Sequence, residues 1–223
     1  MKFKLLAAVM VLLTAFSFAG CGNKDKGSVK PPETGYVKVS PEKDEANADL
    51  GEYWLGSDGI KLYFNEETHP LGIAEVVRDY FTAVQKGDFE KFRGCIDPNY
   101  REILDAFLVT KDSTPEKSFE TQRSSLAGRA GGADYAVTRI KIETPIYDKM
   151  KNRTEGDYLN YLEELGGIMG GDIKSAIINN NDAIYEITFF LMVKTEGVEQ
   201  ESVIIEEQSM IVTEKNGNFH LIG

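Results

Sequence analysis

One segment, residues 70–86, constrains the fold more than any other because it forms a long helical pattern with a single apolar face. At 100° per residue, its large apolar side chains fall within an arc of about 140°. These side chains are Ile73, Val76, Val77, Tyr80, Phe81 and Val84. Pro70 suits a first helical turn, and Gly87 suits a left-handed C-terminal cap. A helix of this kind needs a broad apolar surface against it, and we expect a sheet to supply that surface.

The C-terminal part of the chain carries the clearest strand signals. Residues 184–194 and 201–214 are rich in branched and aromatic side chains, and Glu196-Gly197 can turn the chain between them. Asn216-Gly217 is a strong hairpin signal that leads into a third strand over residues 218–222. Long strands joined by tight turns predict an antiparallel meander, which twists and curls.

Shorter helices and one further strand are predicted between these two regions. Asp88 can cap a helix over residues 89–95, and Asp97-Pro98 can begin the next one. Thr114-Pro115-Glu116 can begin another helix that reaches about residue 127. Apolar and polar side chains alternate over residues 134–147, which indicates a strand.

Four glycines divide the helical pattern that follows, which covers residues 157–165 and 173–178. Each glycine costs about 1 kcal/mol in a helix interior. We therefore expect a break, a hinge or a close backbone contact, and the glycines concerned are Gly166, Gly167, Gly170 and Gly171. A flap over a pocket and a plain helix–loop–helix crossover both remain open.

A small hairpin is predicted before the first long helix. Residues 53–55 and 60–64 are apolar runs on either side of Asp58-Gly59, a hairpin signal. We expect this hairpin to pack beside the main domain. Trp54 is either a platform for a ligand or a packing residue.

The N-terminus has the pattern of a secretory signal. Lys2 and Lys4 precede an apolar run over residues 5–15 that is too short to span a bilayer. Phe18-Ala19-Gly20-Cys21 follows and resembles the lipobox of bacterial lipoproteins, with Phe18 in place of the usual Leu. The resemblance implies that residues 1–20 are removed and that Cys21 carries diacylglycerol, which places the protein on the extracytoplasmic side of the cell membrane. An ordinary signal peptide with an incidental cysteine is the alternative.

The rest of the chain divides into a spacer and one domain. Residues 21–50 are polar, with few large apolar side chains, and this composition predicts a flexible tether. Residues 51–223 form a single α+β domain in this interpretation, with its core in residues 71–223 and the hairpin at 53–64. We expect N-terminal helices packed on a curved antiparallel sheet that ends in a three-stranded meander.

Charge and cysteine content exclude several classes of function. The formal net charge is −11 and the pI is about 4.8, so an acidic surface would repel the phosphate backbone of nucleic acids. Loss of Lys2 and Lys4 with the signal would change the charge from −11 to −13. Cys95 would then be the one unmodified thiol, which rules out an intramolecular disulfide. A buried, unreactive thiol is the favoured interpretation of Cys95.

The order of elements resembles that of the nuclear transport factor 2-like domain, also described as a cystatin-like cone. The resemblance covers residues 71–223 and is most specific from Tyr80-Phe81 to Gly87-Asp88-Phe89. It implies a curved sheet wrapped around the long helix, as is common in small lipoproteins of Gram-positive bacteria. It also implies a pocket inside the cone. The residues that we expect to line this pocket are Tyr80, Phe81, Tyr135, Tyr185 and His220.

The resemblance leaves the function open, because such domains include isomerases, dehydratases and binding modules. An enzyme would need a base and an oxyanion donor in the cone, and the chain offers only His69 and His220 as histidines. No metal-ligand spacing, nucleophile elbow or Ser/His/Asp arrangement is visible, so we expect neither metal nor cofactor. The favoured function is a non-catalytic domain that binds a small molecule, a peptide or another envelope protein. The alternative is a small isomerase- or dehydratase-like enzyme, and a homodimer is possible in either case.

Overall fold

The computed structural model describes residues 35–41, 48–144 and 158–223. The lipobox with Cys21, most of the predicted tether and the end of the strand predicted over residues 134–147 therefore lie outside the described residues. Within the described ranges, no helix is long and apolar enough to cross a membrane.

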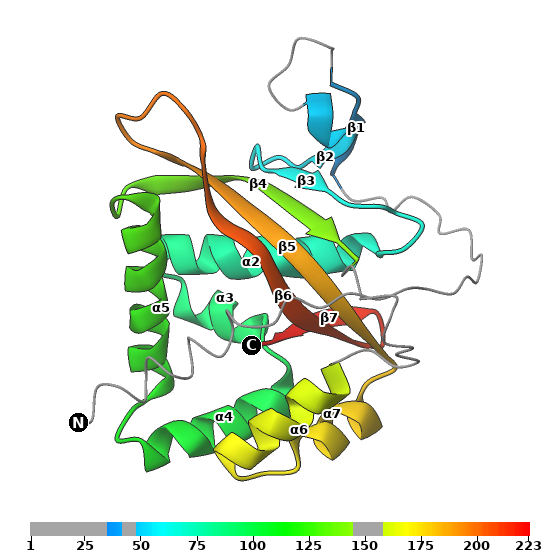
Figure 1. Cartoon of the computed structure of the whole chain (residues 1–223), viewed down its shortest axis with the longest axis vertical. Helices are drawn as coiled ribbons and strands as arrows, with labels where there is room; N and C mark the ends of the chain where they lie inside the picture. Colours follow the sequence, from blue (N-terminus) through cyan, green and yellow to red (C-terminus); the bar gives the residue numbers. More distant parts are fainter. Residues whose placement is uncertain (1–34, 42–47, 145–157) are drawn as a thin grey trace, which may run out of the picture.

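Within the described residues, seven strands form one sheet whose spatial order follows the chain (Figure 1). They are β1 (Val37–Val39), β2 (Tyr53–Leu55), β3 (Lys61–Tyr63), β4 (Tyr135–Glu143), β5 (Ala183–Thr195), β6 (Ser202–Lys215) and β7 (Asn218–Ile222). The part of the chain that the structure describes also contains six α-helices and a short 3-10 helix, η2 (Ala48–Leu50). The α-helices are α2 (Leu71–Lys86), α3 (Phe89–Gly94), α4 (Pro98–Thr110), α5 (Pro115–Ala130), α6 (Tyr158–Met169) and α7 (Ile173–Asn180). The predicted α+β class and the C-terminal meander are confirmed.

The predicted sheet differs from the structure in one pairing, because β3 and β4 run parallel while all other neighbours are antiparallel. A parallel pair needs a long crossover, and α2, α3, α4 and α5 provide it between these two strands. The sheet is therefore mixed.

The hairpin of β2 and β3 forms as predicted, with Trp54 opposite Leu62. Its expected place beside the domain is wrong, because β3 pairs with β4 and so extends the main sheet. Leu62 and Tyr63 are buried, and this burial favours incorporation of the hairpin. The range predicted as tether also contains β1, which pairs with β2 and which the sequence analysis did not predict.

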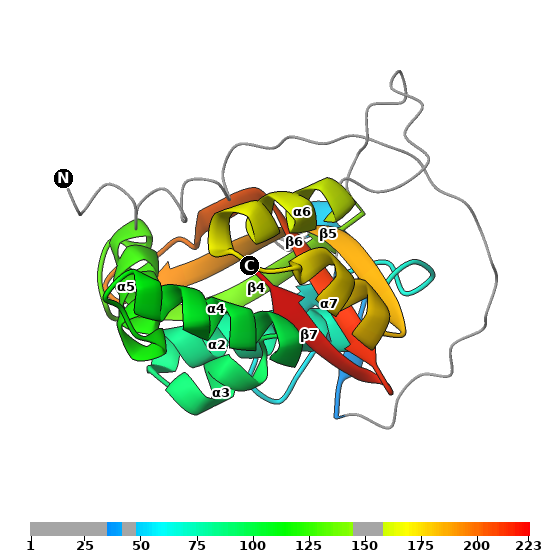
Figure 2. The ribbon, with the colours of Figure 1, turned by 90° about the horizontal axis from the view of Figure 1, so that it is seen from below.

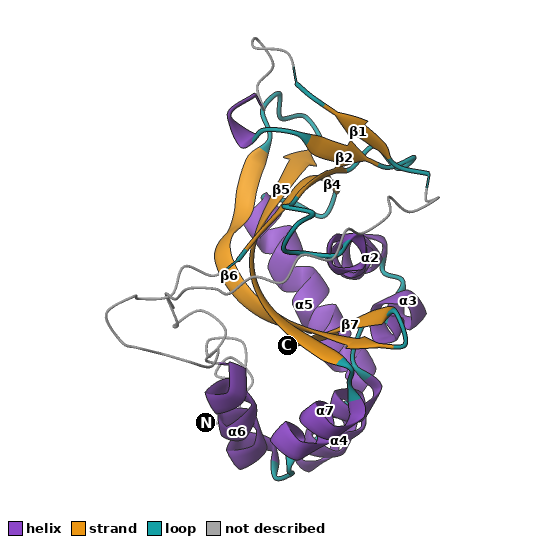
Figure 3. Cartoon of the chain, turned by 90° about the vertical axis from the view of Figure 1, so that its right-hand side faces the viewer, coloured by secondary structure: helices purple, strands orange, loops and turns teal. Residues whose placement is uncertain are grey.

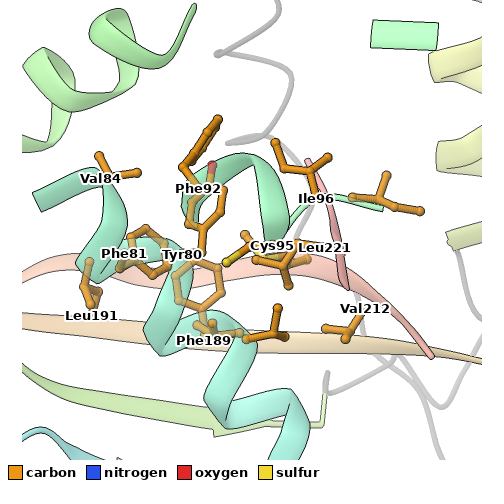
Figure 4. Close-up of a cluster of buried hydrophobic side chains, with 14 of the residues drawn as sticks. Tyr80, Phe81, Val84, Phe92, Cys95, Ile96, Phe189, Leu191, Val212 and Leu221 are labelled. Carbon is orange, nitrogen blue, oxygen red and sulfur yellow. The ribbon is translucent and has the colours of Figure 1, made fainter. Parts of the chain in front are cut away.

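Helix α2 lies along the concave side of the sheet, which curves around it (Figure 3). Pro70 precedes its first turn, and Gly87 ends it in the left-handed region with φ 72°. Its apolar face is buried as predicted, and Phe81 packs against Phe189 of β5 with ring centroids 5.2 Å apart. Burial of one such large apolar side chain contributes about 1.5–3 kcal/mol. The core cluster around this contact is drawn in Figure 4.

The end of the sheet is covered on both faces. In Figures 1 and 3, α2 and α3 lie on one side of β7, and α4 and α7 lie on the other. Figure 2 shows α4, α6 and α7 from below, around the end of β7. Successive side chains of a strand point to opposite faces of the sheet. Because both faces are covered here, Ile211, Val212, Leu221 and Ile222 are all buried.

The predicted break between the two helices forms at Gly170-Gly171, where φ of Gly170 is +78°, and not at Gly166-Gly167, because α6 continues to Met169. A Cβ atom on Gly166 would lie only 2.6 Å from the carbonyl oxygen of Gly171. Gly166 thus permits the close backbone contact that was one of the predicted possibilities. Helices α6 and α7 pack on α4 and form a helix–loop–helix unit between β4 and β5. The expected crossover is wrong, because β4 and β5 are adjacent antiparallel strands.

Three register shifts interrupt the sheet, one where β4 pairs with β5 and two where β5 pairs with β6. In β4 the register shifts between Val137 and Arg139, so the buried side changes from Tyr135 and Val137 to Ile140 and Ile142. The simple alternation predicted for this strand is therefore interrupted. In β6 the register shifts again at Glu206 and Glu207, and φ of Glu207 is 50°. Bulges increase local twist, which helps the sheet to curve around α2.

Candidate functional site

A cavity of about 90 Å³ lies between α2, α5, β6 and the end of β7. Its apolar lining comes from all four elements and consists of Tyr80, Phe81, Leu126, Ile205, Met210 and Ile222. Its polar lining consists of Gln122, Ser125, Arg129, Gln208 and Ser209, and Gly223 completes the wall. We treat this cavity as the candidate functional site because it combines an apolar floor with a few polar groups.

Helix α5 supplies most of the polar lining. Gln122, Ser125 and Arg129 are spaced by three and four residues and therefore share one face of the helix. The helix begins where the Thr114 hydroxyl accepts a hydrogen bond from Lys117 N at 3.3 Å, with Pro115 at the first position. A second anchor is Phe119, whose ring contacts those of Phe89 and Phe92 with centroids 5.5 and 4.8 Å apart. This anchor fixes how α5 turns its polar residues toward β6.

One hydrogen bond crosses the cavity from α2 to α5. The Tyr80 hydroxyl donates to Oε1 of Gln122 at 2.7 Å. The Tyr80 ring is held by Phe81 and Phe92, each with its centroid 5.1 Å away (Figure 4). Burial raises the pKa of the Tyr80 hydroxyl, so it stays a neutral donor at physiological pH.

Two further phenols lie close enough to Tyr80 to interact with it electrostatically. Burial raises the pKa of Tyr100 on α4, and it raises the pKa of Tyr161 on α6 to about 12. Among the described residues that line the cavity, none is Asp, Glu, His or Cys, and Arg129 is the one charged side chain. The cavity therefore offers hydrogen-bond donors and apolar contact, but no group that takes up a proton near pH 7.

The structure brings together two of the five residues that were expected to line one pocket. Tyr80 and Phe81 line the cavity, whereas Tyr135 faces a separate open hollow of about 910 Å³ at the start of β4. Tyr185 donates a hydrogen bond to Glu214 at 2.8 Å, outside the cavity. His220 interacts electrostatically with Asp97 and Arg101, and burial lowers its pKa.

Sequence reasoning missed the polar side chains of α5 and β6 that line the cavity. The reason is that Gln, Ser and Arg are common on the exposed face of any polar helix, so their presence does not indicate a binding site. The spacing of Gln122, Ser125 and Arg129 was visible, but it describes a solvent-exposed face equally well. Only the packing of Phe119 shows which face of α5 turns inward.

A second polar cluster, centred on Asp97, holds the fold together. Asp97 is fully buried, and Oδ1 accepts hydrogen bonds from Asn99 N at 2.9 Å and Tyr100 N at 3.1 Å. Oδ2 accepts from Thr213 Oγ1 at 2.8 Å and from Asn181 Nδ2 at 3.1 Å. We call these residues the Asp97 clamp, because they join α4, α7 and β6. With both oxygens occupied, Asp97 is unsuited to serve as a base.

The other residues that the sequence analysis singled out, Cys95, His69 and Trp54, pack against or hydrogen-bond to other residues of the protein. Cys95 is buried, burial raises the pKa of its thiol to about 12, and Sγ donates to Lys91 O at 3.3 Å. Burial lowers the pKa of His69, which hydrogen-bonds the Thr68 hydroxyl at 2.9 Å. Trp54 stacks on Phe64 at 6.5 Å and packs against the core. Over the described ranges, no group of His, Cys, Asp and Glu side chains could hold a metal ion.

Comparison with known proteins does not assign this chain to a family. No protein-family model, no curated protein and no solved structure matches this chain.

Proposed function

We propose that this protein is a membrane-anchored, extracytoplasmic lipoprotein whose α+β domain is a non-catalytic binding or scaffolding module. The anchoring half of the proposal is supported by the N-terminal signal pattern and by Ala19-Gly20-Cys21, followed by a polar segment. Two acyl chains on Cys21 would give durable attachment, because a single chain binds a membrane only marginally. The curved sheet around α2 supports the resemblance to nuclear transport factor 2-like domains.

The binding half is carried by one observation, the composition of the cavity. An isomerase- or dehydratase-like site needs a positioned base beside its hydrogen-bond donors. The described lining supplies donors from Tyr80, Gln122 and Arg129 but no Asp, Glu or His side chain. Asp97, the buried carboxylate nearest to β7, has both oxygens engaged in the clamp. This composition favours reversible binding over proton transfer.

The anchoring proposal is tested by a Cys21→Ala variant in a bacterial host that processes lipoproteins. We expect the unmodified protein in the membrane fraction, with a mass increased by diacylglycerol. The variant should lose this modification and leave the membrane fraction. Cys95→Ala is the matched control, because it also removes one cysteine but leaves the lipobox intact. A Cys21→Ala protein that stays in the membrane fraction would contradict the proposal.

The binding proposal is tested by native mass spectrometry of the full chain purified from such a host. We expect a non-covalently retained molecule, and the same spectra report any homodimer. Ser125→Trp should abolish the retained mass, because Ser125 lines the cavity and a tryptophan would fill it. Ser124→Trp is the control, because Ser124 is exposed on another face of α5. Equal retention by both variants would place the ligand elsewhere.

A further inference from the structure

The hydrogen bond from Tyr80 fixes the orientation of the Gln122 amide. Tyr80 donates to Oε1, so Nε2 is the end of the amide that remains for another partner. Within the described part of the chain, no side-chain or backbone acceptor hydrogen-bonds Nε2 of Gln122. The amide therefore presents two N–H groups beside the cavity rather than an acceptor oxygen.

Arg129 adds donors on the same face of α5, two turns further along the helix. It lines the cavity and is solvent-exposed, and it forms no ion pair with any acid in the described ranges. Its guanidinium donates hydrogen bonds and accepts none. No Asp or Glu side chain lines the cavity, so a cationic ligand group would meet the like charge of Arg129 with no acidic side chain to offset its loss of water.

The apolar lining and the small volume of the cavity limit the rest of the ligand, beyond its polar end. Phe81, Leu126, Ile205, Met210 and Ile222 make the floor apolar. A volume of about 90 Å³ corresponds to about three water molecules at their volume in the liquid. It is smaller than the roughly 300–1,000 Å³ that is typical of pockets for drug-sized ligands. A short alkyl chain fills this space, and its polar end reaches the α5 side.

We propose that the cavity binds a short, mainly apolar molecule that ends in an acceptor oxygen, which is a carboxylate or an amide carbonyl. The oxygen accepts hydrogen bonds from Gln122 Nε2 and Arg129, and the alkyl part contacts the floor. This inference rests on the proposed binding function and specifies the chemistry of its ligand. Tyr80 acts as a positioning residue, because its hydroxyl holds the donor end of Gln122 toward the ligand.

Four-carbon probes that differ only in the polar end test the inference. Butyrate, butyramide, butylamine and 1-butanol are titrated into the full chain, and side-chain amide and methyl signals are followed by NMR. We expect butyrate and butyramide to shift the Gln122 Nε2 signals, and butylamine to leave them unchanged. If butylamine or 1-butanol binds as tightly as butyrate, the inference is overturned.

Variants of α5 and of Tyr80 test which side chains contact the oxygen of the ligand. Arg129→Gln should weaken butyrate binding about tenfold, because a charge-assisted hydrogen bond is lost. Arg123→Gln is the matched control, since it makes the same change on the same helix but faces the other hollow. Tyr80→Phe should reduce the preference for butyramide over butylamine, because Gln122 can then turn its oxygen toward the ligand. Equal effects of the two arginine variants would refute the assigned contact.

The failure of this inference is distinguishable from failure of the proposed function. If Ser125→Trp abolishes a retained molecule but no four-carbon acid or amide binds, the binding function stands and the ligand class is wrong. If the native protein retains nothing and no probe perturbs the cavity signals, both proposals are wrong.

Discussion

The Asp97 clamp and the cavity beside Gln122 both include residues of β6, yet they use polar groups in opposite ways. In the clamp, both carboxylate oxygens of Asp97 accept hydrogen bonds from backbone and side-chain donors. In the cavity, Gln122 has one protein partner and Arg129 forms no ion pair with a described acid. Saturated polar groups hold elements together, whereas unsaturated groups at a cavity wall are open to a ligand.

The largest expected effect comes from breaking the clamp with Asp97→Ala. The N–H groups of Asn99 and Tyr100 would lose their carboxylate acceptor, and Thr213 and Asn181 would each lose one of their two acceptors. Because buried donors without partners are costly, we expect a loss of at least about 3 kcal/mol in the free energy of unfolding. Chemical denaturation measures this change.

Asp105→Ala is the control for the clamp, because it removes a carboxylate from a partly exposed pair with Arg93. Such pairs contribute about 0–1 kcal/mol, so this variant should remain close to the unmodified protein. If the two variants unfold at the same denaturant concentration, the clamp does not stabilise the fold as we describe.

The next largest effect is expected from Gly166→Ala, beside the helices that the clamp holds. The added Cβ would lie 2.6 Å from the Gly171 carbonyl oxygen, and a backbone atom cannot move away cheaply. We expect a loss of about 2 kcal/mol in the free energy of unfolding. Gly167→Ala is the control, because nothing lies within 4 Å of its Cβ, and it should stabilise α6 by up to about 1 kcal/mol. A Gly166→Ala protein as stable as Gly167→Ala would contradict the close contact.

Gln122→Leu should weaken butyrate binding more than it lowers the free energy of unfolding, and so distinguish the cavity from the Asp97 clamp. The variant leaves the Tyr80 hydroxyl without its partner, which should cost about 1 kcal/mol in unfolding free energy. Its effect on butyrate binding should be larger, about tenfold, because the ligand loses the Nε2 donors. Thermal unfolding and NMR titration measure the two quantities. A variant that loses several kcal/mol of stability would make Gln122 part of the structural framework instead.

The smallest effect is a pH dependence from the two histidines. Burial lowers the pKa of His69 and His220 from 6.5, so the unfolded chain takes up their protons at a higher pH than the folded chain does. Stability should therefore be unaffected by these groups well above pH 6.5 and should fall as the pH drops below it. Urea unfolding at pH 7.5 and pH 5.5 measures the change. A His69→Gln, His220→Gln double variant should show a smaller decrease, and an identical decrease would exclude the histidines as its source.

Local patterns in the sequence were sufficient for most elements. Pro70, Gly87 and the apolar stripe of α2 predicted a helix whose bounds the structure confirms. Asn216 and Gly217 have φ of 52° and 77°, as the predicted hairpin turn between β6 and β7 requires. Helix α5 runs to Ala130 instead of about residue 127, because Gly131 and not Gly128 adopts the left-handed conformation that ends it.

The errors concern relations between distant segments. The parallel pairing of β3 with β4 joins residues on either side of four helices, and no local signal reports it. The bulge in β4 changes the buried side of that strand halfway along its length, which a simple alternation does not anticipate. For the same reason, Tyr135, Tyr185 and His220 could not be assigned to a pocket from sequence.

The amino-acid sequence by itself determined the single amphipathic helix, the meander that covers it, the α+β class and the acidic character of the chain. These properties follow from local periodicity, turn chemistry and composition, which act over a few residues. Only the tertiary structure decided that α5 turns Gln122 and Arg129 toward β6 and that Asp97 meets Thr213 and Asn181. Those contacts depend on the packing of side chains far apart in the chain, because burial selects one register and one helix face among several that the pattern allows.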